Sequence, residues 1–360
     1  MKRLSDTPSF STYASLDHRD AGQRQNSCSW KGTPSKFMGK RGFRRVLTIL
    51  LLLIICASIF PLRAIRDFGP LVALPPKQIP VGVDWSQYAY CQYATNKDYL
   101  CNSVMIFEAL DRVGSKASRV LMYPSNWDIN ANDYTGRLLR QTQARYNVQL
   151  SPVKIQRLAG DPTWADSFTK LLAFNQTQFK RVLSLDSDAT VLQSMDELFF
   201  MPSAPVAMPS AYWRDNILSS QLILIEPSEV EFRRILEAFD TRSTRHFDME
   251  IMNRLYGSDC IVLPHRTYNL LSGEFREKEH QRYLGSDKET WDPEKAMEEA
   301  KYVHFSDWPV PKPWKLKGSV QTKELRPECR ITNAGEDCRD RDIWLDLYAD
   351  FAKRRKLCDV

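Results

Sequence analysis

Beyond residue 45 the sequence has almost no net charge, and this absence excludes one large class of partners. The first 45 residues hold ten of the 50 Lys and Arg residues and three of the 44 Asp and Glu residues, which leaves 40 basic and 41 acidic side chains in the other 315. A protein that binds nucleic acid normally presents a concentrated basic surface. We therefore expect no nucleic-acid partner, and the basic surplus belongs to an N-terminal tail.

Three other patterns are missing from the sequence. No internal repeat is visible, which argues against a solenoid or another repeat architecture. The cysteines lack the repeated spacing of a zinc site, and no residue stands out as a covalent nucleophile beside a base. With 360 residues, the chain can hold one large domain or two small ones with ample core.

Long hydrophobic runs are also scarce, and residues 46–62 form a conspicuous one. This stretch has 17 uncharged, mostly apolar residues, which is short for a span, and the basic cluster at 40–45 predicts that its N-terminal side is cytosolic. A cleaved signal peptide would start nearer residue 1, and a buried core helix is the other alternative. We expect a disordered cytosolic tail over 1–45, a type II signal anchor over 46–62 and a Pro-rich, unpacked stem over 63–84. The short anchor favours the Golgi membrane, with the rest of the chain in the lumen.

A lumenal location would allow the cysteines beyond the anchor to oxidise. Cys329 and Cys338 lie close together in the sequence and are the first expected disulfide, whereas Cys91 and Cys101 are expected to be buried thiols rather than partners of each other. The segment Asn175-Gln176-Thr177 has the acceptor pattern for N-glycosylation.

From residue 85 onward, strand-like and helix-like stretches alternate. This pattern predicts an α/β fold with a mostly parallel central sheet, and such sheets bind ligands beyond the C-terminal ends of their strands. We place one α/β domain over 85–317 and a C-terminal helical extension over 318–360. The expected strands are 88–95, 119–123, 153–158, 181–185, 204–208 and 221–225, and the expected helices are 99–113, 133–146, 163–175, 229–239, 247–256 and 340–356.

Two carboxylates, Asp186 and Asp188, directly follow the apolar run at 181–185. Carboxylates with this spacing at the end of a buried strand can share one hard divalent cation, Mn²⁺ or Mg²⁺, whose coordination a diphosphate would complete. Alone, Asp188 could equally cap a turn, and Asp186 could pair with a nearby Lys or Arg.

Three segments, in order along the chain, carry a resemblance to a known family. They are Ala94-Thr95-Asn96-Lys97-Asp98-Tyr99, Leu185-Asp186-Ser187-Asp188, and His304-Phe305-Ser306-Asp307-Trp308-Pro309 with Lys312-Pro313-Trp314. Together they resemble the glycogenin-like retaining glycosyltransferases of family 8 over roughly residues 88–314. The long form of the last segment, and Gly160-Asp161-Pro162-Thr163-Trp164, are most similar to the fungal Golgi N-acetylglucosaminyltransferase (glucose N-acetyltransferase) subgroup.

The resemblance implies a nucleotide-diphospho-sugar transferase domain of the GT-A, Rossmann-like type. It also implies transfer of a sugar, N-acetylglucosamine in this subgroup, from a UDP-sugar to a glycan acceptor with retention of configuration. By that resemblance Asp186, Asp188 and His304 bind the metal, Lys312 contacts the diphosphate, and Thr95, Asn96 and Tyr99 contact the uracil. Ser187 and Gln221 complete the donor-binding set, and Lys170 and Asp248 lie near the donor sugar as catalytic candidates.

Three departures from glycogenin qualify these expectations. The stretch from His304 to Lys312 is longer by two residues, Met249 replaces a glutamine, and Ser219-Ser220-Gln221 stands where glycogenin has Asn-Ser-Gly. A UDP-glucose enzyme of the glycogenin kind and a catalytically inactive scaffold of the same fold are therefore the alternatives. Attack on the same face of the sugar is favoured over a covalent intermediate on Asp248.

Overall fold

The computed structural model describes residues 71–155, 167–243, 246–316, 318–332 and 335–360. The chain divides into two units, 1–66 and 67–360, and the described residues all belong to the second unit. The predicted tail and anchor, and the first part of the stem, lie outside the described residues. Among the described helices, none has the length and apolar character needed to cross a bilayer.

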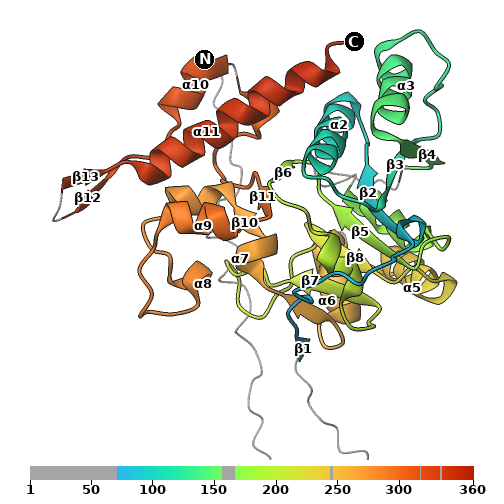
Figure 1. Ribbon diagram of the computed structural model, residues 1–360, viewed down its shortest axis with the longest axis horizontal. Helices are drawn as coiled ribbons and strands as arrows, with labels where there is room; N and C mark the ends of the chain where they lie inside the picture. Colours follow the sequence, from blue (N-terminus) through green and yellow to red (C-terminus); the bar gives the residue numbers. More distant parts are fainter. Residues whose placement is uncertain (1–70, 156–166, 244–245, 317, 333–334) are drawn as a thin grey trace, which may run out of the picture. The chain divides into compact units, whose positions relative to one another are not determined.

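A mixed sheet of eight strands forms the centre of the described unit (Figure 1). Five of its seven neighbouring pairs are parallel, and β8 pairs with β5 and β7 in the antiparallel sense. The predicted mostly parallel α/β sheet is therefore confirmed. In spatial order the strands are β1 (Leu71–Val72), β9 (Ile261–Leu263), β7 (Val206–Pro209), β8 (Leu222–Ile225), β5 (Arg181–Leu185), β2 (Tyr88–Tyr93), β3 (Ser118–Pro124) and β4 (Val148–Val153).

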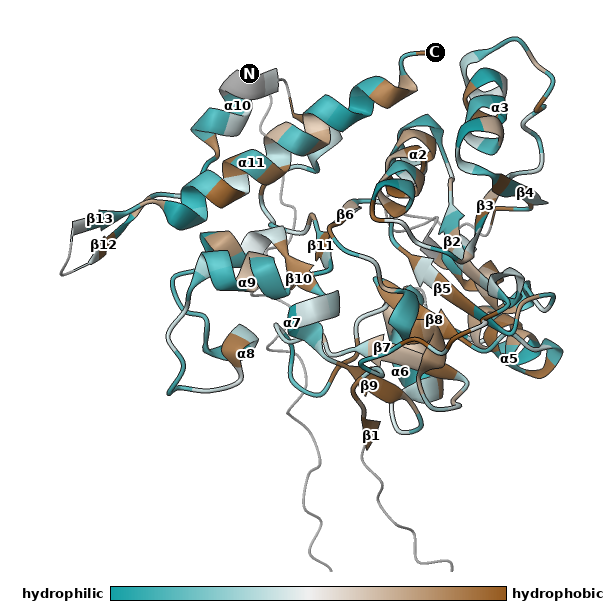
Figure 2. Ribbon diagram, viewed as in Figure 1, coloured by the Kyte–Doolittle hydropathy of each residue, from teal (hydrophilic) through white to brown (hydrophobic). Residues whose placement is uncertain are grey.

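The strands in the middle of the sheet are buried along their whole length, as expected when both faces are covered. Figure 2 shows β8 as a hydrophobic ribbon, while α2 and α3 carry both hydrophobic and hydrophilic residues. The helices are α2 (Lys97–Arg112), α3 (Tyr134–Tyr146), α5 (Glu229–Asp240), α6 (Asp248–Tyr256), α7 (His265–Tyr268), α8 (Gln281–Leu284), α9 (Pro293–Glu299), α10 (Gly318–Glu324) and α11 (Arg339–Arg354).

Two smaller sheets and several 3-10 helices complete the described part. The first small sheet joins β10 (Leu270–Leu271), β11 (Tyr302–His304) and β6 (Ala189–Val191), and the second pairs β12 (Arg330–Thr332) with β13 (Gly335–Asp337). The 3-10 helices are η2 (Trp85–Gln87), η3 (Ser167–Asn175), η4 (Asp196–Phe200), η5 (Ser272–Arg276), η6 (Pro313–Lys315) and η7 (Arg355–Cys358).

Three expectations from the sequence are wrong in detail. The stem is not unpacked up to residue 84, because β1 pairs with β9 at the sheet edge. The strand expected at 153–158 begins at Val148, because Asn147 adopts a left-handed conformation that ends α3 and leads directly into the strand. The described part of the expected helix at 163–175 is the 3-10 helix η3, and Asn175 at its end is exposed.

Two disulfides fix the C-terminal part of the chain. The expected pair Cys329–Cys338 closes the β12–β13 hairpin. The expectation of a free thiol is wrong for Cys101, because this residue forms a disulfide with Cys358 in η7. For Cys91 the expectation is confirmed, and its thiol is free and buried. Sequence spacing gave no indication of a pair separated by 257 residues. The bond attaches the end of the chain to α2.

We expect the two disulfides to contribute unequally to stability. Their sequence separations are 257 and 9 residues, so the chain-entropy model predicts that Cys358→Ser costs roughly 3 kcal/mol more unfolding free energy than Cys338→Ser. Urea unfolding of both variants under oxidising conditions measures this difference. Equal losses would show that loop closure is not how the Cys101–Cys358 bond stabilises the fold.

Candidate functional site

The pairing of β6 with β11 brings two distant parts of the sequence to one place. Asp186 and Asp188 follow β5 at its C-terminal end, and β6 begins at the next residue. Ala189 is the register partner of His304, and the amide of Phe305 donates to the carbonyl of Asp188 at 2.9 Å. As a result, His304 Nε2 lies 3.1 Å from Asp188 Oδ1.

These residues form a set that suits a divalent cation. One ligand atom from each of Asp186, Asp188 and His304 lies within 4.8 Å of the others. His304 is 5% exposed, and neither of its ring nitrogens has a hydrogen bond of good geometry in the described part of the protein. Buried polar atoms are normally satisfied, so an imidazole without a well-aligned hydrogen bond, next to two carboxylates, fits a bound Mn²⁺. Cys329, Glu336 and Cys338 also lie together, but both thiols are in a disulfide.

Lys312 closes the same group from the far end of its loop. Its Nζ is 2.6 Å from Asp188 Oδ2 and donates to the carbonyl of Phe305 at 2.5 Å. Burial alone would raise the pKa of Asp188, but His304 and Lys312 outweigh that effect and hold this pKa well below its usual range. Asp188 is therefore an ionised carboxylate beside a cationic side chain.

Lys170 links a second pair of carboxylates. Its Nζ lies 2.8 Å from Asp186 Oδ1 and 2.8 Å from Asp248 Oδ2, and its side chain is 4% exposed. Burial by itself would lower the pKa of Lys170, but the two carboxylates outweigh it and raise the pKa above its usual value. For Asp186, burial is the larger effect and raises the pKa, and Lys170 opposes the rise. Lys170 thus joins the metal-binding carboxylates to Asp248 at the start of α6.

Three side chains that the sequence analysis did not select hold this cluster in place. The hydroxyl of Tyr93 donates to Asp186 Oδ1 at 3.2 Å, Ser220 Oγ donates to Asp248 Oδ2 at 2.6 Å, and the hydroxyl of Tyr302 donates to the carbonyl of Asp186 at 2.8 Å. Burial and the charge of Asp186 raise the pKa values of Tyr93 and Tyr302, so both remain hydrogen-bond donors. Ser220 falls in a segment already marked as different from glycogenin, but no sequence pattern indicated the tyrosines.

The predicted nucleotide residues lie after β2, next to β5 in the sheet. Asn96 is the N-cap of α2, and its side-chain Oδ1 accepts hydrogen bonds from the backbone amides of Asp98 and Tyr99. This oxygen therefore already caps the helix. Thr95 is buried. The ring of Tyr99 meets that of Trp314, just beyond Lys312, edge to face at 5.4 Å. The two ends of the predicted nucleotide site are thus in contact.

Ser187 and Gln221 are both adjacent to Asp186. Ser187 sits between Asp186 and Asp188, and the carbonyl of Gln221 accepts from the amide of Asp186 at 2.9 Å. Ser187 Oγ and Gln221 Oε1 are buried and lack a hydrogen-bond partner among the described residues.

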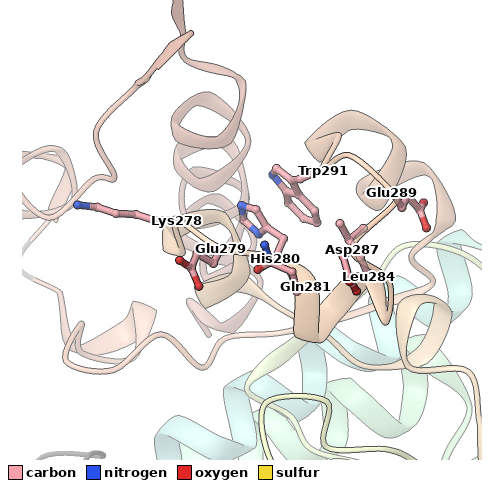
Figure 3. Close-up of a pocket in the computed structure, with 8 residues that line it drawn as sticks. All are labelled: Lys278, Glu279, His280, Gln281, Leu284, Asp287, Glu289 and Trp291. Carbon is pink, nitrogen blue, oxygen red and sulfur yellow. The ribbon is translucent and has the colours of Figure 1, made fainter.

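A separate pocket of about 130 Å³ lies around His280 and Trp291 (Figure 3). His280 Nδ1 is 2.7 Å from Glu274, and the imidazole stacks on the indole at 4.1 Å. None of the predicted donor-site residues lines this pocket.

No family model matches the chain, but curated relatives do. The Gibberella zeae protein named glucose N-acetyltransferase 1 is 54% identical over 286 residues, covering 76% of this chain and 63% of its own length. The chain thus spans less than two thirds of that relative. The Aspergillus fumigatus protein of the same name is 48% identical over 299 residues, covering 77% of this chain and 78% of its own length. Glycogenin from Neurospora crassa is 24% identical over 155 residues, covering 41% and 21%.

Solved structures give a weaker similarity. The galactosyltransferase LgtC in complex with donor and acceptor sugar analogs is 11% identical with a TM-score of 0.47, covering 73% of this chain and 95% of that one. The resemblance found in the sequence is confirmed: the chain belongs to the glucose N-acetyltransferase 1 family, of which glycogenin is a distant relative.

Proposed function

We propose that this protein is a metal-dependent glycosyltransferase, a hexosyltransferase that moves a sugar from a UDP-sugar donor to a glycan acceptor with retention of configuration. The convergence of Asp186, Asp188 and His304, with Lys312 against Asp188, carries the proposal. Two carboxylates, an imidazole and an ammonium group at the C-terminal end of β5 are suited to a cation and a diphosphate.

Asp186, Asp188 and His304 would hold Mn²⁺ or Mg²⁺. When bound, the cation would act as a Lewis acid toward the negative charge of the diphosphate. Lys312 adds a positive charge from the protein itself. Its side chain is 22% exposed, and the ammonium group is carried on a flexible chain of four carbons. An interaction that strengthens as the leaving group gains charge lowers the barrier of the reaction.

Asp248 is better suited to orienting the donor sugar than to attacking it. Its Oδ2 accepts from Ser220 Oγ at 2.6 Å and lies 2.8 Å from Lys170 Nζ. A carboxylate stabilised by an ammonium group and a hydroxyl is a weaker nucleophile. This supports attack on the same face, in which the leaving diphosphate accepts the proton of the acceptor hydroxyl.

The donor sugar that we propose is N-acetylglucosamine. The resemblance to the fungal N-acetylglucosaminyltransferase subgroup supports this donor, and the relatives carry the name glucose N-acetyltransferase 1. The segment Ser219-Ser220-Gln221 also differs from glycogenin, and the hydroxyl of Ser220 is engaged by Asp248. UDP-glucose is the alternative donor.

We also propose a Golgi location, with a single-pass type II anchor over 46–62 and a lumenal catalytic domain. The apolar run and its basic flank support the anchor. The two disulfides support an oxidising compartment.

Removal of one metal ligand should abolish turnover. Because Asp188 contacts both His304 and Lys312, we expect Asp188→Ala to lower kcat/KM on the order of 10³-fold with little change in the thermal midpoint. The matched control is Asp111→Ala, which removes an exposed carboxylate paired with Arg119. Near-normal turnover of Asp188→Ala, measured as manganese-dependent release of UDP, would show that the metal assignment is wrong.

Lys170 should matter for stability as well as for turnover. Lys170→Met leaves two buried carboxylates without their shared cation, and we expect a loss of about 3–5 kcal/mol of unfolding free energy. Lys295→Met removes an exposed lysine that also pairs with two carboxylates and should hardly change the unfolding midpoint. Similar denaturation curves for the two variants would contradict the central role of Lys170.

A donor screen decides between the two sugars. Hydrolysis of UDP-N-acetylglucosamine, UDP-glucose and UDP-galactose by the full chain in detergent with Mn²⁺ should be fastest for UDP-N-acetylglucosamine. A preference for UDP-glucose would overturn the donor proposal, and the absence of hydrolysis and of UDP binding would favour an inactive scaffold.

A further inference from the structure

The loop between two of the predicted donor-site residues has a buried carboxylate at its centre. Loop 305–312 runs from the residue after His304 to Lys312, and Asp307 within it is 7% exposed. Among the described residues, no Lys or Arg lies within ion-pair distance of Asp307. A buried charge without an ionic partner is expensive, so its presence calls for a structural explanation.

The partners of Asp307 are two neutral donors on the C-terminal helix. Trp344 Nε1 donates to Asp307 Oδ2 at 2.7 Å, and the hydroxyl of Tyr348 lies 2.7 and 2.8 Å from the two carboxylate oxygens. Both residues are in α11, are fully buried, and stack on each other at 4.0 Å. Burial raises the pKa of Asp307, and the hydrogen bonds from Trp344 and Tyr348 oppose that rise. These bonds reduce the cost of the buried charge, and they fix the direction of the carboxylate.

Gly273 in η5 packs closely against the same loop. A Cβ atom at Gly273 would lie 2.6 Å from the carbonyl oxygen of Ser306 and 3.0 Å from Cα of Asp307, too close for any side chain. The close approach of η5 and the hydrogen bonds from α11 therefore leave the centre of the loop little freedom to shift.

Both ends of the loop return to Asp188. The amide of Phe305 donates to the carbonyl of Asp188 at 2.9 Å, and Lys312 Nζ contacts both the Asp188 carboxylate and the carbonyl of Phe305. A shift of Asp307 would therefore move both Phe305 and Lys312 relative to Asp188. The position of the central carboxylate is thus coupled to the position of Lys312.

We infer that Tyr348 and Trp344 are positioning residues, which act through Asp307 to hold Lys312 and His304 where a diphosphate binds. The inference rests on the proposed function for the identity of the ligand. It assigns the C-terminal helix to the phosphate end of the donor site. The role of Tyr348 is local, so its loss should weaken binding of phosphate more than binding of the base.

The test compares Tyr348→Phe with Tyr90→Phe in the full chain. Tyr90 also donates from a buried hydroxyl to a buried carboxylate, Asp196, which accepts from the amide of Lys116 as well. Both variants should lose similar thermal stability. Calorimetry with Mn²⁺ should show about tenfold weaker UDP binding for Tyr348→Phe only, while binding of uridine, measured by ligand-observed NMR, stays unchanged. Equal UDP affinities in the two variants, or a parallel loss for uridine, would overturn the inference.

Two further measurements separate this inference from the proposed function. In a double-mutant cycle that combines Tyr348→Phe with Asp307→Asn, the double variant should bind UDP no more weakly than the single variant with the lower UDP affinity. Additive losses of affinity would contradict the coupling.

Hydrogen exchange without ligand should be faster over residues 305–312 in Tyr348→Phe but not in Tyr90→Phe. If exchange over residues 305–312 is faster in Tyr348→Phe but the unmodified protein does not bind UDP, the positioning role is supported and the proposed function is contradicted. Unchanged exchange in Tyr348→Phe would contradict the positioning role.

Discussion

The balance of buried charge at the C-terminal end of β5 is the constraint on which the site depends. Asp186, Asp188 and Asp248 are all at most 9% exposed, and Lys170 and Lys312 form ion pairs with them. Among the described side chains of this cluster, three carboxylates and two ammonium groups leave a net negative charge when the imidazole is neutral. A divalent cation would reverse that sign and attract a diphosphate, which is the physical reason why metal and nucleotide should bind together.

Long-range pairing, rather than local structure, assembles this charge cluster. The β6–β11 ladder sets His304 beside Asp188, and the end of β2 brings Tyr93 to Asp186. The C-terminal part then surrounds the loop that carries Lys312: α11 binds Asp307, and Phe351 packs on Phe305 and Trp314. The Cys101–Cys358 disulfide links the end of this part to α2. The site is thus held from both the sheet and the C-terminal helix.

The sequence predicted the features that depend on local pattern. The strand at 181–185 is a short apolar run, and the helix at 229–239 has apolar residues at helical spacing. Cys329 and Cys338 are nine residues apart, so their disulfide could be predicted from the sequence. Features that depend on tertiary pairing were missed. Tyr93 and Tyr302 look like ordinary strand residues, and Cys101 meets Cys358 only after the fold is complete. Lys170, Asp248 and Lys312 were selected by resemblance, and their contacts with the carboxylates became visible only in three dimensions.

The most direct test of the central claim is a crystal of the full chain grown with UDP and Mn²⁺ and measured at the manganese absorption edge. The account predicts one anomalous peak bounded by oxygens of Asp186 and Asp188 and a ring nitrogen of His304, with phosphate oxygens completing the coordination and Lys312 beside them. A manganese peak elsewhere, or UDP bound without contact to these three side chains, would contradict it.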